Sequence, residues 1–234
     1  MGSFCFPTGV LPFHTQQKTH IRKDGAIMKT NKIITISRQL ASGGRSIGKL
    51  LAEKFDIPYY DKELLAIAAK DSGISISHFE DADEQPTNSF LYNLSLNPQI
   101  FADGFTDYPT VLSNDRLFII QSDTIRKISE KGPCVIVGRL ADYILSENES
   151  VFSLFIHADM DYRAARLRKT LDIQENKIQS YLTKADKRRS SYYNYYTGKK
   201  WREAANYDLC VNAGKLGDEG AADAIVSFIT SCEK

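Results

Sequence analysis

The chain has 234 residues, of which 42% are hydrophobic and 25% are charged, and its formal net charge is +1. These values are typical of a single globular domain that buries a substantial core and has room for an inserted lobe. No stretch approaches the roughly 18 consecutive apolar residues that a membrane helix needs, so no membrane-spanning helix is expected.

Residues 1–28 are irregular, and prolines and glycines interrupt their apolar stretches, so they contain no signal-peptide core. We expect this segment to be a disordered tail, or an upstream extension of a chain whose natural start is Met28. The four cysteines lie far apart. Cys134 and Cys210 fall inside apolar runs, which predicts buried thiols in a reducing cytoplasm.

Short apolar runs alternate with helical patterns along the rest of the chain. Nearly continuous apolar runs of this length are typical of parallel strands that are covered on both faces. Helical spacing is kept by Ile47, Leu51 and Phe55, and again by residues 64–68 and 117–128. A long helix is predicted from a capping-box pattern at Asp172 and Glu175 to Thr197 and Gly198. This alternation predicts a doubly wound α/β sheet with right-handed crossovers. The predicted strands are Ile33–Ile36, Ile57–Tyr60, Cys134–Val137, Val151–Ile156 and Tyr207–Val211.

Two segments differ sharply in charge. Residues 71–123 contain nine acidic residues and a single arginine, whereas residues 160–202 contain twelve Lys or Arg and four acidic residues. The basic segment is therefore where an anionic ligand would be drawn. The stretch from about 73 to 112 also breaks the alternation of strands and helices. It is interpreted either as a long surface excursion or as a lid-like lobe that binds an acceptor.

The stretch "ISRQLASGGRSIG" (residues 36–48) stands between a predicted strand and a predicted helix, where nucleotide-binding proteins hold phosphate. It fits the pattern G-x-x-x-x-G-K-[ST] in part. Gln39 stands at the first glycine, Arg45 at the lysine, and Ser46 at the hydroxyl residue that touches Mg²⁺. Backbone N–H groups of Ser42–Ser46 can cradle a phosphate without the lysine, and a guanidinium can fork onto two oxygens. The alternative is a plain strand-to-helix turn.

Arg139 ends another buried strand, in "CVIVGRLADYIL", at the carboxyl edge where open α/β sheets bind ligands. An arginine there needs an anion or an acid, so it faces either a ligand or a neighbouring carboxylate such as Asp61 or Asp142. Further basic residues follow: Arg163, Arg166 and Arg168, and then Lys184, Lys187, Arg188 and Arg189. Each of these basic residues taken alone could lie on the solvated surface. Taken together, they favour an anion-binding site.

Three ordered motifs together resemble the cytidylate kinase-like family, a branch of the P-loop nucleoside monophosphate kinases. They are "ITISRQLASGGRSIGKLLAEKFDIPYYDKELL", "CVIVGRLADYIL" and "DKRRSSYYNYYTGKKW…NYDLCVN", within residues 32–232. The resemblance implies a three-layer α/β P-loop kinase fold with a five-stranded parallel sheet. It places the kinase-like domain at 29–234, with a helical acceptor-binding insertion near 73–112 and a lid near 160–202.

The resemblance also implies roles for particular residues. Asp61, Arg139 and Asp186 would bind the acceptor, and Arg45, Arg163 and Arg189 would act on the transferring phosphoryl group. Departures are Gln39 and Arg45 in the loop, and Leu140 where the family has the aspartate of G-R-D. Ser42, Gly43, Gly44, Arg45, Ser46 and Ile47 would bind ATP, with Ser46 also on Mg²⁺.

We therefore expect a cytoplasmic kinase that moves the γ-phosphoryl group of ATP, with Mg²⁺, to a small phosphorylated acceptor such as CMP or dCMP. Neither a membrane nor a nucleic-acid partner is expected, and the oligomeric state is left open. A second hypothesis is a nucleotide sensor with a weakened loop and little turnover. A third is a single-stranded nucleic-acid binder that stacks bases on Tyr192, Tyr193, Tyr195 and Tyr196. These rings equally suit a helix that packs them, with Trp201, against the base of the lid.

Overall fold

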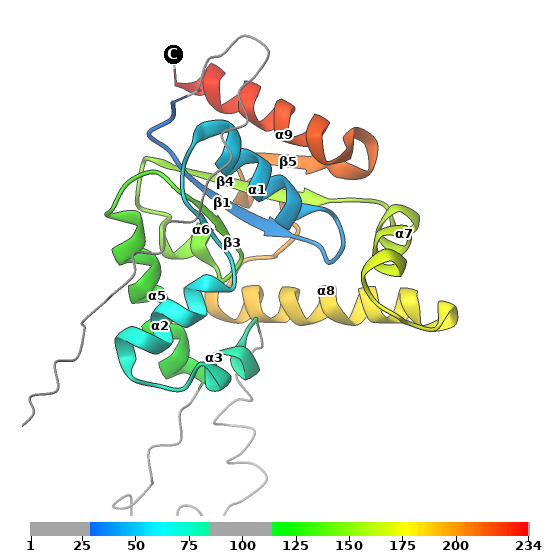
Figure 1. Cartoon of the computed structure of the whole chain (residues 1–234), viewed down its shortest axis with the longest axis horizontal. Coiled ribbons are helices and arrows are strands. Elements are labelled where there is room, and N and C mark those ends of the chain that lie inside the picture. The colour runs from blue at the N-terminus through cyan, green and yellow to red at the C-terminus, as the bar shows by residue number, and fades with distance from the viewer. Residues whose placement is uncertain (1–28, 85–113, 234) are drawn as a thin grey trace, which may run out of the picture.

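The computed structural model of the protein describes residues 29–84 and 114–233. Five parallel strands form one sheet in the order β2-β3-β1-β4-β5 (Figure 1). Each strand overlaps one of the five predicted ranges, so the expected sheet is confirmed. The predicted segment 1–28, and the part of the predicted insertion from 85 onward, lie outside the described residues. The strands are β1 (Ile33–Arg38), β2 (Tyr59–Tyr60), β3 (Val135–Val137), β4 (Val151–His157) and β5 (Leu209–Asn212).

Alternation along β1 divides the core into two layers, because successive strand side chains point to opposite faces. Ile34 and Ile36 pack with α1 (Gly44–Phe55) and α9 (Ala213–Cys232) on one face. Ile33 packs on the other face, where Leu64 of α2 (Glu63–Ser72) and Ile125 of α5 (Asn114–Ser129) cover the sheet together with α6 (Ala141–Ile144). The result is a helix–sheet–helix arrangement of three layers (Figure 1).

The basic segment forms two helices, of which the first lies beyond the carboxyl end of β4 and the second runs back from it toward the sheet (Figure 1). They are α7 (Met160–Thr170) and α8 (Glu175–Thr197), joined by a short connection (Figure 1). At their outer end Leu167, Ile178 and Leu182 pack together. At the inner end Tyr192 and Tyr193 are buried against the sheet with Trp201, ahead of the short 3₁₀ helix Ala204–Asn206.

A short helix, α3 (Ile76–Ala82), follows α2 in the acidic segment that the sequence reading treated as an insertion. Its Phe79 is buried against Leu65 and Leu117, so α3 packs onto α2 and α5. The described start of the insertion is therefore part of the packed structure. Residues 83 and 84, just after α3, are brought to the edge of the sheet.

Two expectations about local structure were wrong. The long helix runs to Thr197 as predicted, but Gln174 is its N-cap and no side chain caps it. Glu175 is its first residue and accepts a hydrogen bond from Arg168 Nε at 2.8 Å, so there is no capping box. Cys134 is buried, but Cys210 is exposed. The reason is that β5 is an edge strand, and Val211 rather than Cys210 faces the core.

Among the helices in the described part of the chain, none is both long and apolar enough to cross a membrane.

Candidate active site

The loop between β1 and α1 presents backbone N–H groups to an open cleft. Gly43 is the N-cap of α1 and has φ 98°. The first helical hydrogen bond is donated by Ile47 N–H to Gly43 O at 2.9 Å. By position, the N–H groups of Gly44, Arg45 and Ser46 have no intrahelical acceptor. They line a cleft of about 370 Å³ between the loop and α7. The start of α1 therefore has the form of an anion site.

Gly44 makes this close approach of strand and helix possible. A Cβ at position 44 would lie 2.6 Å from Cβ and 2.8 Å from Cγ of Arg38, next to the backbone of β1. Ordinary van der Waals contact between carbon atoms requires about 3.5–4.0 Å. The loop thus depends on the missing side chain.

We expect Gly44→Ala to lower the free energy of unfolding by about 1–3 kcal/mol, because it overpacks this contact. It should also weaken ATP binding, since β1 and α1 must separate. Gly220→Ala, inside α9 with Leu216 Cβ 3.5 Å away, is the matched control and should be neutral or slightly stabilising. Urea unfolding and calorimetry measure both effects. Equal stability of the two variants would contradict this packing argument.

Gln39 and two of the predicted site residues, Arg163 and Asp186, form a buried support behind the loop. Leu40 N–H donates to Asp186 Oδ1 at 3.1 Å, and Leu40 O accepts from Arg163 Nε at 2.8 Å. Arg163 Nη2 lies 2.8 Å from Asp186 Oδ2, and both residues are at most 4% exposed. Gln39 Oε1 accepts from Ala158 N–H at 3.2 Å. The non-glycine at position 39 thus ties the loop to the end of β4.

Ser42 and Ile47 also face the interior. Ser42 is fully buried, and its hydroxyl donates to Gln39 O and Ile156 O. Ile47 is fully buried in the core between α1 and the sheet, and its N–H is used within the helix. Both side chains hold the loop in shape, and neither reaches the cleft.

Arg45 and Ser46 do reach the cleft. The Arg45 side chain is 53% exposed, and its Nε lies 2.6 Å from Asp61 Oδ2. Ser46 Oγ accepts from Arg166 Nη2 at 3.2 Å, and Arg166 also makes two hydrogen bonds to the carboxylate of Asp218. Arg45 and Ser46 also line a second cleft of about 250 Å³ that contains Asp61. Two clefts therefore meet at the start of α1.

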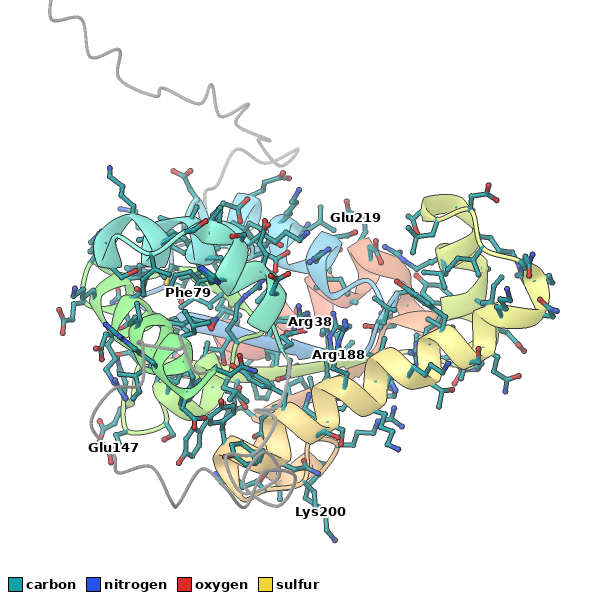
Figure 2. All side chains as sticks on the ribbon, turned by 90° about the horizontal axis from the view of Figure 1, so that it is seen from below. Arg38, Phe79, Glu147, Arg188, Lys200 and Glu219 are labelled. Carbon is teal, nitrogen blue, oxygen red and sulfur yellow. The ribbon has the colours of Figure 1, made fainter. Side chains whose placement is uncertain are left out.

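Three buried or half-buried arginines converge beside this point; we call Arg38, Arg139 and Arg189 the arginine cluster. Figure 2 shows Arg38 between α3 and the long helix α8. Arg139 Nη1 donates to Asp61 Oδ1 at 2.6 Å and to Val137 O at 3.0 Å. Asp142, the other acid considered for Arg139, is hydrogen-bonded to Tyr193 instead.

Two acidic residues after α3 neutralise the arginine cluster. Glu84 pairs with Arg38 through one oxygen and with Arg189 Nε through the other, the second contact at 2.7 Å. Asp83 pairs with Arg139 Nη2 at 2.9 Å. Burial opposes the charge of Glu84, but Arg38 and Arg189 outweigh it and hold the pKa of Glu84 well below its usual value. Burial raises the pKa of Asp83, against the pull of Arg139.

The backbone at Arg139 is strained. Gly138, Arg139 and Leu140 all have positive φ, between 54° and 80°. A left-handed conformation costs a non-glycine residue about 1–2 kcal/mol, so surrounding contacts must hold these two residues in place. Leu140 is buried among the aromatic rings at the inner end of α8. Leu140, which stands where the family has the aspartate of G-R-D, thus packs in the core of this protein.

The structure adds residues that the sequence reading did not select. They are Asp83, which pairs with Arg139; Glu84, which pairs with Arg189; Arg38, whose carbonyl accepts from Arg189; and Asp218, which pairs with Arg166. Arg38 ends β1 as Arg139 ends β3, so its position at a strand end was a usable signal. No local pattern marks the three acids. Conversely, the basic residues Lys184, Lys187 and Arg188 are exposed on α8 and line neither cleft.

The sheet order, the glycine-bearing loop after the first strand and the arginine-lined edge define the fold of a P-loop kinase. A solved shikimate kinase from Bacteroides thetaiotaomicron shares this fold, with a TM-score of 0.52, 12% identity, and coverage of 85% of this chain and 98% of that one. The chain itself belongs to the cytidylate kinase-like family, whose model matches residues 33–215.

An uncharacterized protein from Eubacterium ventriosum ATCC 27560 is a closer structural relative than the shikimate kinase. Its crystal structure is 32% identical, with a TM-score of 0.64, over 86% of this chain and 99% of that chain. No curated protein matches the sequence.

Proposed function

We propose that this protein is an ATP-dependent phosphotransferase that moves the γ-phosphoryl group to a small phosphorylated acceptor, with CMP or dCMP as the first candidates. One observation carries the proposal. Two clefts meet at Arg45 and Ser46 at the start of α1, and the arginine cluster lies directly beside them. Phosphoryl transfer needs cradled phosphates and positive charge around the migrating group, and this arrangement supplies both. The family of the chain supports the same reaction class.

The donor phosphates would lie on the N–H groups of residues 44–46. The cleft beside them also contains Arg166, and apolar side chains of Leu40, Leu167 and Leu171 form part of its wall. Arg45 would take the place of the usual lysine. A guanidinium binds two oxygens as a planar fork, whereas an ammonium acts as a point charge, so Arg45 would orient the phosphates differently.

The acceptor would approach from the side of Asp61 and Arg139. A phosphate monoester already presents a nucleophilic oxygen, so an acceptor such as CMP requires no strong general base. A hydroxyl acceptor would use Asp61 as its base. Arg189 belongs to the arginine cluster and also lines the donor cleft. It would neutralise the negative charge that develops during phosphoryl transfer. In this proposal the helices α7 and α8 act as the lid, and Arg163 and Asp186 hold the loop.

A magnesium ion would be held mainly by the phosphates. Ser46 and Asp61 line the same cleft and offer the hard oxygen ligands that Mg²⁺ prefers. The ion would neutralise the outer phosphates. Because Ser46 Oγ now faces Arg166, the guanidinium would have to turn toward a phosphate for this hydroxyl to reach the ion.

We expect steady ADP release from Mg-ATP with at least one phosphorylated acceptor among CMP, dCMP, UMP and AMP, and shikimate tests a hydroxyl acceptor in the same assay. Arg45→Met should lower kcat by about 10²–10³, as the removal of one transition-state donor does in other enzymes. Arg188→Met is the matched control and should keep the wild-type kcat, because Arg188 is exposed on α8 and lines neither cleft. A coupled ADP-release assay measures these rates. Equal activity of Arg45→Met and wild type would refute the role of Arg45.

The second candidate, a nucleotide-binding sensor, is favoured by one observation: each guanidinium of the arginine cluster already has a carboxylate partner. Calorimetric ATP binding without turnover on any acceptor would support it. The third hypothesis, a single-stranded nucleic-acid binder, needs exposed tyrosine rings on α8 for base stacking. Tyr192 and Tyr193 are buried, and Tyr195 is the exposed ring among the four tyrosines considered in this described helix.

A further inference from the structure

Glu84 occupies the space between two arginines in the way that an anionic ligand would. Its two carboxylate oxygens each take one guanidinium, one from Arg38 at the end of β1 and one from Arg189 of α8. Two oxygens of a phosphate could meet the same two groups, one guanidinium on each oxygen, as charge-assisted hydrogen bonds. The cavity that remains among these side chains is only about 20 Å³, room for a single water molecule.

The neighbouring hydrogen bonds are incompletely satisfied. In the described structure the Nε of Arg139 and the Oδ1 of Asp83 are buried and have no hydrogen-bond partner. Arg139 is 1% exposed, so water does not compensate for this. Buried polar groups are nearly always paired, and an unpaired one calls for an explanation. A tetrahedral anion offers more acceptor oxygens than the planar carboxylate of Asp83, and one of them could accept from Arg139 Nε.

The segment that carries the two acids is held in an unfavourable conformation. Glu84 has φ 53°, in the left-handed region that residues with a Cβ rarely adopt. Its ion pairs with Arg38 and Arg189 are the contacts that offset this strain. A ligand that took over the two arginines would therefore also relieve the backbone at Glu84.

We propose that Glu84, aided by Asp83, is a built-in competitor for the anion site formed by the arginine cluster, and that it sets the selectivity for phosphate monoesters. A weakly charged compound does not displace the carboxylate, whereas a phosphate dianion does. In identifying the ligand with the acceptor, this inference rests on the proposed function. The anion competition itself does not require catalysis.

The test measures binding of inorganic phosphate without ATP. Trp201 lines the same cavity and is the single tryptophan of the chain, so its fluorescence reports on the occupant. We expect Glu84→Gln to bind phosphate at least about tenfold more tightly than wild type, because a neutral amide competes less well for the two guanidinium groups. Glu80→Gln, an exposed acid on α3, should bind as wild type does. Unchanged or weaker binding by folded Glu84→Gln overturns the proposal.

A second measurement covers the case in which Glu84→Gln does not fold. In wild type, phosphate should speed hydrogen exchange of amides in residues 76–84, because displacing Glu84 frees the end of α3. Saturation is established from the tryptophan signal. Exchange that stays unchanged at saturating phosphate refutes the displacement. Since neither measurement involves turnover, tight phosphate binding by Glu84→Gln without ADP release on any acceptor would leave the anion site standing and remove only the proposed activity.

Discussion

Asp186→Asn is expected to lower the free energy of unfolding by about 3–5 kcal/mol and to abolish measurable ATP binding. Asparagine keeps an oxygen for Leu40 N–H, but it leaves the charge of Arg163 without its partner in a position that is 2% exposed. Because Arg163 also holds Leu40 O, the loop loses its order together with the ion pair. Urea unfolding and ATP calorimetry measure the two effects.

Two further variants separate stability from loop order. Arg202→Gln removes the other, largely exposed partner of Asp186 and should cost less than about 1 kcal/mol. The double variant Arg163→Met, Asp186→Leu replaces a buried pair with apolar groups, which is often neutral for stability. It should fold yet still bind ATP poorly, because both polar groups of Leu40 lose their partners. Full ATP affinity in this double variant would show that the pair does not order the loop.

The second large effect is expected for Arg139→Met. Arg139 is 1% exposed and pairs with both Asp61 and Asp83, so its loss should cost about 3–5 kcal/mol at pH 7. Asp61 keeps Arg45 as a partner, whereas Asp83 is left as a partly buried carboxylate without its cation. The larger part of the cost should therefore come from Asp83.

This cost should depend on pH in a defined direction. Burial already raises the pKa of Asp83, and removing Arg139 raises it further. A carboxyl group with a raised pKa in the folded state favours folding at low pH, and this contribution is lost as pH rises through that pKa. The stability gap between Arg139→Met and wild type should thus be smaller at pH 5 than at pH 7.

Urea unfolding at both pH values checks this expectation. Adding Asp83→Asn to Arg139→Met should recover part of the loss at pH 7. The control is Arg126→Met, because Arg126 is exposed on α5 and pairs with exposed Asp123. It should change stability by less than about 1 kcal/mol at either pH. A gap that stays constant between pH 5 and pH 7 would rule out Asp83 as the source of the cost.

The sequence by itself determined the sheet and the position of the loop. Apolar runs such as Cys134–Val137 form strands wherever both faces of a parallel sheet are covered, and the five ranges overlap the five observed strands. The glycines at 43 and 44 marked the start of α1, and Arg139 was found because it follows a buried strand. Each of these signals is local, carried by neighbours within a few positions.

Tertiary structure decided which charges meet. Leu40 and Asp186 are 146 residues apart, and Arg38 and Glu84 are 46 apart, so no local pattern indicates either contact. Arginine and aspartate are residue types that often bind ligands, so the sequence did not distinguish Arg163 and Asp186 from ligand-binding residues. The packing of α7 and α8 places both side chains behind the loop. Composition and periodicity fix which segments are strands and helices. The partner of a buried charge depends on which segments the core brings together, and only the folded chain determines that.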